Sequence, residues 1–182
     1  MFVVLDETVV PCCCNGCGSS FKPWGYARER AVRERGGWWR VVRPRRVRCR
    51  ACKVTHVLLP ALLAPRRADS AQVILGALLA KAGGRGHRSI AAELSLPAST
   101  VRGWLRRAGA NAEQARCEAT RTAIELDPLL APIDPVGNPL AEALNAVGTA
   151  VVAARLRLGP SIGSPTALVM VIGRSLLHPL RT

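Results

Sequence analysis

The 182-residue sequence predicts an α+β fold, with a small β domain at residues 1–60, a mostly α-helical domain at 66–110 and a helical tail at 111–182. Strand-like segments lie between two C-x-x-C motifs in the first third of the chain. After Pro60, apolar residues recur at helical spacing, and Gly and Pro mark the helix ends. Aromatic residues make up only 4% and apolar residues 49%, which favours small modules and helices built from Ala, Leu and Val.

The net charge of +14 is concentrated in the first two thirds of the chain. Residues 1–67 carry 14 basic and 4 acidic groups, residues 68–111 carry 6 and 2, and residues 112–182 carry 6 and 6. This gradient predicts a polyanionic partner for the first two thirds. Arg outnumbers Lys 23 to 3, and the planar guanidinium suits phosphate and guanine. A GC-rich genome would also raise the Arg content, but it would not produce the gradient.

The sequence shows no targeting segment, because MFVVLDETVV lacks a basic start and a long apolar core. The longest apolar run, ALVMVI at 167–172, is far shorter than the roughly 20 residues that span a bilayer. We therefore expect a cytoplasmic, nucleoid-associated protein. In a reducing compartment, clustered cysteines indicate metal binding rather than disulfides.

Four cysteines have the spacing of a structural zinc site. Cys14 and Cys17 form one C-x-x-C turn, and Cys49 and Cys52 form a second. Two residues between thiolates let one tight turn aim both sulfurs at a single ion, so two such turns supply a closed tetrahedral set. We predict one structural Zn²⁺ per chain, held by these four residues.

The 31 residues between the two motifs predict a β-hairpin that holds the metal-binding turns together. The segments FKPWGYAR and WWRVVRPRRVR are strand-like, and the turn-prone Arg35–Gly37 joins them. Two cysteine turns on a hairpin form a zinc ribbon.

Four further residues are weaker candidates. Cys12 and Cys13 either compete as ligands or lie beside the site in the entering strand, and His56 is a fifth candidate ligand. Cys117, in an expected helix, is interpreted as a small packing residue.

The expected hairpin also carries a second basic surface, formed by Arg40, Arg43, Arg45, Arg46, Arg48 and Arg50. This surface could follow a phosphate backbone or an RNA strand. Trp24, Tyr26, Trp38 and Trp39 are interleaved with these arginines. They could stack on bases, but we expect them to form a hydrophobic cover over the zinc.

Residues 70–108 predict three helices. Asp69 or Ser70 can cap a helix through AQVILGALLAKAG, which GGRGH ends. A short helix at 88–94, a tight turn at 95–97 and a second helix at 98–108 follow. This pattern resembles the helix-turn-helix of bacterial DNA-binding proteins. Ser95 stands where that turn usually has Gly, although the left-handed conformation costs more for Ser.

The helix-turn-helix resemblance implies that helix 98–108 lies in the major groove of duplex DNA. Its apolar residues Val101, Trp104 and Leu105 would face the core. Its outward residues are the candidate DNA contacts: Ser99, Thr100, Arg102, Arg106 and Arg107. Arg102 is the candidate for a bidentate guanine contact, whereas Arg106 and Arg107 would hold phosphates. The alternative is an ordinary helical hairpin with a solvated Arg face.

The neutral tail predicts an amphipathic helix at 111–126, a Pro-rich connector, and a longer helix that Gly159-Pro160 ends. The longer helix carries an a/d stripe: Leu140, Leu144, Val147, Val151, Ala154 and Leu158. A last helix would begin near Ser164 and carry Leu168 to Leu176. The stripe would pack against this last helix, or residues 140–176 would form a homodimer.

Together the motifs CNGCG, VRCRACKVTHVLLP and GHRSIAAELSLPASTVRGWLRR resemble an actinobacterial group of zinc-ribbon and helix-turn-helix proteins of unknown function. This group is similar to the N-terminal DNA-binding region of insertion-sequence transposases. The resemblance implies DNA binding linked to mobile elements, with a transposase as a candidate partner. Lys53 departs from the Gly that such ribbons often have.

Three functions remain in competition at this point. The first is a non-enzymatic, sequence-specific DNA-binding protein, either a transposase-related accessory factor or a transcriptional regulator. The second is a transposase or nuclease, or a fragment of one, but the acids after residue 111 spread over 30 residues without a βαβ pattern. The third is an RNA-binding zinc-ribbon protein.

Overall fold

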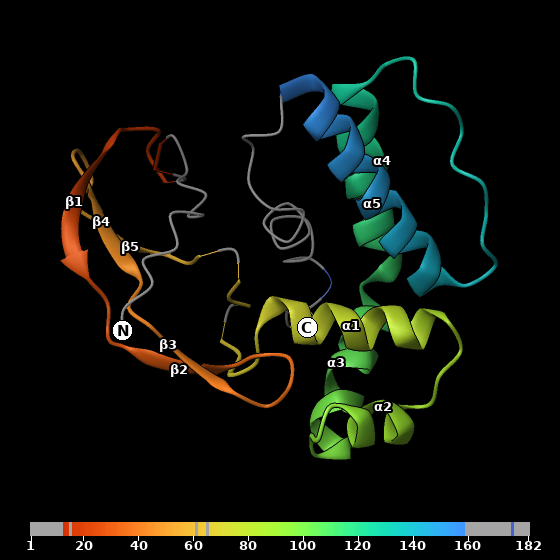
Figure 1. Cartoon of the computed structure of the whole chain (residues 1–182). Coiled ribbons are helices and arrows are strands. Elements are labelled where there is room, and N and C mark those ends of the chain that lie inside the picture. The colour runs from red at the N-terminus through yellow and green to blue at the C-terminus, as the bar shows by residue number, and fades with distance from the viewer. Residues whose placement is uncertain (1–12, 15, 61, 65, 159–175, 177–182) are drawn as a thin grey trace.

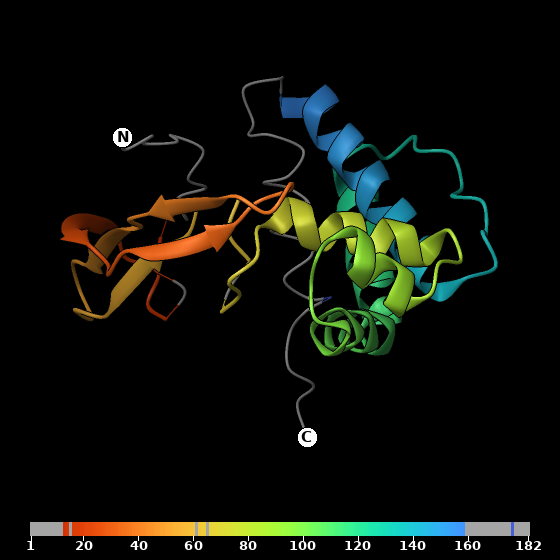
Figure 2. The same ribbon diagram turned by 60° about the horizontal axis from the view of Figure 1, so that its bottom comes forward.

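The computed structural model describes residues 13, 14, 16–60, 62–64, 66–158 and 176, and it has an α+β fold. The strands of this part are β1 (Phe21–Tyr26), β2 (Arg30–Arg33), β3 (Trp39–Val42), β4 (Arg45–Cys49) and β5 (Thr55–Leu58). Its helices are α1 (Ala71–Ala82), α2 (His87–Glu93), α3 (Ala98–Ala110), α4 (Ala112–Leu126) and α5 (Pro139–Leu158). The strands occupy one end of the molecule and α4 and α5 the other (Figures 1 and 2). None of these helices has the length and apolar character needed to cross a membrane.

The strands form two antiparallel sheets rather than the single hairpin that the sequence predicts. Strands β2 and β3 pair around the predicted turn, where Gly36 and Gly37 both adopt positive φ. The segment WWRVVRPRRVR does not continue as one strand, because Pro44 has no N–H to donate and separates β3 from β4. Strand β4 then pairs with β1 on one side and β5 on the other.

The junction between the β part and α1 depends on an ion pair and a helix cap. Ser70 is the cap of α1, because its Oγ accepts a hydrogen bond from Val73 N at 3.4 Å. Asp69, the alternative cap, is instead buried and pairs with Arg33 of β2 at 2.7 Å. Ser70 N also donates to Arg33 O at 2.8 Å. The backbone and side chain of Arg33 therefore tie the second sheet to the start of α1.

Helices α2 and α3 are joined by a tight turn at Ser95, Leu96 and Pro97, as predicted. Ser95 has φ of 53°, which is the left-handed conformation. Leu96 N donates to Ala91 O at 2.9 Å, and the Leu96 side chain is buried beneath the turn. The predicted inward residues Val101 and Trp104 are buried, and Leu105 is half-buried.

Ser95→Gly is expected to stabilise the protein by about 1 kcal/mol, because glycine adopts the left-handed conformation without the steric cost that serine meets. Thermal unfolding followed by circular dichroism measures the change. Ala92→Gly is the matched control, because Ala92 is exposed within α2 and should lose about 1 kcal/mol there. A loss of stability in Ser95→Gly would contradict the assigned turn geometry.

All five helices contribute to one hydrophobic core. Its buried members include Ile74 and Leu78 of α1, Ile90 of α2, Trp104 of α3 and Leu140 of α5. The core crosses the domain boundary that the sequence places at residues 110 and 111. Asn111 ends α3 and begins α4, so the two helices follow each other almost without interruption.

Helices α4 and α5 form a helical hairpin, whereas the sequence predicts a hairpin between the longer helix and a last helix that begins near Ser164. The stripe residues Val147, Val151 and Ala154 are buried, and α5 packs against α4 (Figure 1). The facing side of α4 is an alanine row: Ala112, Ala115, Ala119 and Ala123. The small side chains allow the helices to approach closely, so the stripe of α5 packs against α4. Of that predicted last helix, only Leu176 lies within the described residues.

Candidate functional site

The four predicted ligands gather at one end of the three-stranded sheet. The Sγ atoms of Cys14, Cys17, Cys49 and Cys52 all lie within 4.8 Å of one another. Strand pairing sets this arrangement, because Phe21 of β1 lies opposite Cys49 of β4. The turn before β1 and the turn after β4 therefore meet, as the C-x-x-C spacing predicts.

The backbone of each cysteine turn aims its two sulfurs at one point. In the first turn, Gly18 N donates to Cys14 O at 2.7 Å, and Gly18 has φ of 70°. Lys53 holds the corresponding place after the second turn, with φ of 63°. Lys53 thus adopts the conformation that a glycine would supply, and its Nζ donates to Arg50 O at 2.5 Å.

The sulfur distances fit a tetrahedral ion with thiolate ligands. Cys17 Sγ lies 3.3 Å from Cys49 Sγ, and Cys14 Sγ lies 3.7 Å from Cys52 Sγ. A regular tetrahedron with Zn–S bonds of about 2.3 Å has S–S edges of about 3.8 Å. Cys14 and Cys49 are buried, whereas Cys17 and Cys52 are exposed. The residues present therefore fit a single metal ion at the surface of the sheet.

Two thiols of this cluster, Cys49 and Cys52, have pKa values that are shifted in opposite directions. Burial tends to raise the pKa of Cys49, but a hydrogen bond from Cys17 and others from Cys52 and Ala51 lower it to about 6. The hydrogen bond from Val54 N lowers the pKa of Cys52. Hydrogen bonding with Cys49, burial, and hydrogen bonding with the other two thiols raise it by more, so the pKa of Cys52 rises to about 12. The thiol of Cys49 thus loses its proton readily, whereas the thiol of Cys52 keeps its proton. A bound cation would favour deprotonation of the whole set.

The weaker cysteine and histidine candidates lie in different surroundings. His56 Nε2 is 3.6 Å from Cys14 Sγ, and its ring packs edge-on against Phe21 at 5.1 Å. His56 therefore touches one ligand, although it is not part of the four-sulfur group. Cys13 is half-buried, and Cys12 lies outside the described residues. The prediction for Cys117 is wrong, because Cys117 is exposed on α4 and its Sγ lies 3.4 Å from Glu113 Oε1.

Helix α3 presents the predicted DNA-contact residues on the side opposite its buried face. Ser99, Arg102 and Arg106 are exposed, and Thr100 is half-buried. The opposite side of the same helix carries Val101, Trp104 and Ala108, which are buried. The helix therefore divides into a packed face and a free, basic face.

Arg107 differs from the other predicted contacts, because it is half-buried and bonded to its own helix. Its Nη1 donates to Gly103 O at 3.3 Å. Arg67, just before α1, lies near enough for its pKa to be lowered by burial and then by the charge of Arg107. Sequence spacing gives no signal for this pair, since 39 residues separate the two arginines.

The aromatic residues of the β part do not form a buried cover, so that prediction is wrong. Trp24, Tyr26, Trp38 and Trp39 are 43%, 51%, 53% and 55% exposed, respectively. A cation lies over each ring, at 4.6 to 5.5 Å from the centroid. A cation over a ring face stabilises an exposed aromatic residue without a hydrophobic core. The alternation of Arg with aromatic residues was the sequence signal for this arrangement.

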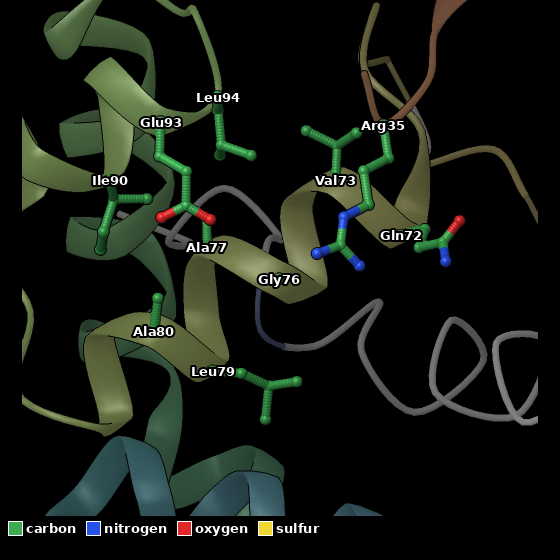
Figure 3. Close-up of a pocket in the computed structure, with 10 residues that line it drawn as sticks. All are labelled: Arg35, Gln72, Val73, Gly76, Ala77, Leu79, Ala80, Ile90, Glu93 and Leu94. Atoms are coloured by element: carbon green, nitrogen blue, oxygen red, sulfur yellow. The ribbon is translucent and has the colours of Figure 1, made fainter. Parts of the chain in front are cut away.

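A shallow pocket of about 280 Å³ lies between α1, α2 and the β2–β3 turn (Figure 3). Its lining is mostly aliphatic, and its charged groups are Arg35 and Glu93. Glu93 pairs with Arg85 at the surface. The residues that line this pocket include no serine, cysteine or histidine.

Comparison with protein families gives a match to the first half of the chain. A family described as "Domain of unknown function (DUF6431)" matches residues 14–104, which is half of the chain. The matched segment begins at the first metal-cluster cysteine and ends at the buried Trp104 of α3. Neither the curated proteins nor the solved structures gave a match.

Proposed function

This chain belongs to the DUF6431 family of domains of unknown function, and we propose that it is a non-enzymatic, sequence-specific binder of double-stranded DNA. In this proposal α2, the turn at Ser95 and α3 form a helix-turn-helix, and α3 enters the major groove. The proposal rests on the exposed basic face of α3. The opposite face of the same helix is packed against the core.

The roles of the α3 residues follow from their exposure. Arg102 is exposed in the first half of α3, and its guanidinium can donate two parallel hydrogen bonds to the O6 and N7 atoms of guanine. Ser99 and Thr100 precede it by one turn or less and would contact bases or phosphates. Arg106 lies one turn later and would hold a phosphate.

Arg107 and Arg67 would bind a second phosphate together. The mutual repulsion that contributes to the lowered pKa of Arg67 would be relieved by an anion between the two guanidiniums. The Nε atom of Arg67 is buried and has no hydrogen-bond partner among the residues that the structure describes. A phosphate bound there would link the segment before α1 to α3 and would fix the orientation of α3 on the DNA.

We assign one structural Zn²⁺ per chain to Cys14, Cys17, Cys49 and Cys52, so that the β part is a zinc ribbon. Four thiolates complete a tetrahedral site without an open position for water, which favours a structural ion over a catalytic one. The ion would hold β1 and β4 in the register that exposes their basic side chains.

We propose a binding role rather than catalysis, either as a transposase-related accessory factor or as a transcriptional regulator. The first acid of α4 is engaged along its own helix: hydrogen bonds from Arg116 lower the pKa of Glu113 to about 2. Glu118 accepts a hydrogen bond from Gln114 at 2.9 Å. These acids stabilise the surface of α4.

Binding to a duplex is expected to weaken steeply with salt, because each phosphate contact releases condensed counterions. Titration of a mixed-sequence duplex at several salt concentrations, monitored by fluorescence anisotropy, measures the slope. A structured RNA of equal charge is the competitor. Tighter binding of the RNA, or a slope near zero, would contradict the proposal.

A further inference from the structure

The three-stranded sheet has two faces of opposite character. The inner face carries Val47 and Cys49 of β4 with His56 and Leu58 of β5, and it leads to the cysteine cluster. Side chains alternate along a strand, so the intervening residues lie on the outer face. The register places Lys22 beside Arg48 and Arg48 beside Thr55. It also places Arg46 beside Val57, so these five residues share the outer face.

Trp24 completes this outer face, because it lies two residues after Lys22 on β1. Its ring is 43% exposed and lies 4.6 Å from Arg48 Cζ and 5.3 Å from Lys22 Nζ, measured to the ring centroid. Arg48 is held in place by a hydrogen bond from its Nε to Lys53 O at 3.0 Å. The arrangement is an exposed indole ring with two cations over it, one of which is fixed by a hydrogen bond.

No carboxylate neutralises these cations within the sheet, since the segments FKPWGY, RRVRC and THVL contain no Asp or Glu. The exposed side chain of Val57 adds an apolar contact to the same face. Aromatic and aliphatic surface flanked by uncompensated positive charge matches an unpaired nucleotide, which has an apolar base face and an anionic phosphate.

The other exposed aromatic residues lack this combination. Arg33, which lies over Trp39, is paired with Asp69, and Arg40, which lies over Trp38, is 3.0 Å from Glu34. Tyr26 lies on the opposite side of the sheet from Trp24. Between Pro23 and Tyr26, three steps along β1 match two along β4, so Tyr26 lies opposite Arg45 on the face of Val47.

We propose that the outer face of the β1–β4–β5 sheet binds single-stranded DNA, with a base stacked on Trp24. In this arrangement Lys22, Arg46 and Arg48 contact the phosphates on either side of that base. Stacking accepts any base, so this face adds affinity for unpaired segments without reading sequence. A protein with this face and the free side of α3 would favour a duplex that adjoins a single strand.

This inference concerns a different surface from the duplex contact, and only the choice of DNA over RNA rests on the proposed function. The two surfaces lie on separate parts of the chain: the sheet on residues 21–58 and α3 on residues 98–110. Failure at one surface can therefore be recognised while the other is intact.

The test measures binding of the full, zinc-loaded chain to labelled oligothymidine by fluorescence anisotropy. Trp24→Leu is expected to weaken binding about tenfold or more, because leucine cannot stack on a base. Trp24→Phe should recover most of the affinity, since it restores an aromatic ring. Trp39→Leu is the matched control, because it removes an exposed tryptophan from the other sheet and should leave binding unchanged.

Zinc content and circular dichroism show whether each variant is folded. A duplex without single-stranded ends tests whether the sheet surface and the α3 surface bind independently. Trp24→Leu should bind that duplex as the unchanged protein does, whereas Arg102→Ala should keep its oligothymidine binding. Three results would overturn the inference: no binding of oligothymidine by the unchanged chain, equal losses in Trp24→Leu and Trp39→Leu, or tighter binding of oligouridine than of oligothymidine. If duplex binding fails while the Trp24 pattern holds, the proposed function fails and the sheet surface stands.

Discussion

Cys49→Ser is expected to abolish tight zinc binding and to unfold the three-stranded sheet. Cys49 is fully buried at the end of β4, and its Sγ lies 3.3 Å from Cys17 Sγ. Structural zinc sites bind with an apparent free energy of about 10–16 kcal/mol. A β part of this size has a small core, so losing even a fraction of that energy exceeds its stability. Metal analysis and circular dichroism measure both effects.

Cys117→Ser is the matched control for Cys49→Ser, because Cys117 is exposed on α4 and lies outside the cluster. It should keep one zinc per chain and an unchanged melting temperature. Acid should mimic Cys49→Ser, because protons compete with the ion for the thiolates. The folded, reduced protein containing no zinc, or Cys49→Ser retaining a full complement, would remove the structural metal from this account.

Arg102→Ala is expected to lose the preference for one base pair in the DNA target. A bidentate arginine–guanine contact contributes about 1–3 kcal/mol of discrimination, and the alanine variant cannot make it. Binding of Arg102→Ala should therefore fall on the preferred duplex and change little on a duplex with that base pair substituted. Anisotropy titrations on the two duplexes measure the difference.

Two further arginine variants distinguish the kinds of contact. Arg106→Ala should weaken binding to both duplexes equally and reduce the salt dependence, as expected for a phosphate contact. Arg121→Ala removes an exposed positive charge from α4 and should change neither affinity nor preference. An equal loss on both duplexes in Arg102→Ala would place Arg102 among the phosphate contacts.

The cysteine cluster and the helices could be predicted from local sequence. The C-x-x-C spacing brings two sulfurs together within a turn, and one strand pairing then joins the two turns. The ends of α1, α2 and α4 lie within one residue of their predicted positions, because Ser70, the Gly-rich breaks and Asp127 are local signals. Even the left-handed Ser95 follows from the geometry that the turn requires.

The arrangement of the strands depended on non-local pairing, which spacing does not encode. Pro44 separates β3 from β4, and β4 then selects β1 and β5 as partners over the adjacent β3. The exposure of the tryptophans was not predicted either, and it arises because the two small sheets have too little volume to bury them. The electrostatic effect of Arg107 on Arg67 depends on how the segment before α1 packs near α3.

The central claim is that the free face of α3 reads the sequence of a DNA duplex. Selection from a pool of random duplexes by the zinc-loaded chain tests it most directly, with Arg102→Ala selected in parallel. We expect the unchanged chain to enrich a short motif that contains a G·C pair at one constant position, and Arg102→Ala to lose the constraint at that position alone. A pool that stays random after repeated rounds, or an identical motif from Arg102→Ala, would contradict the claim.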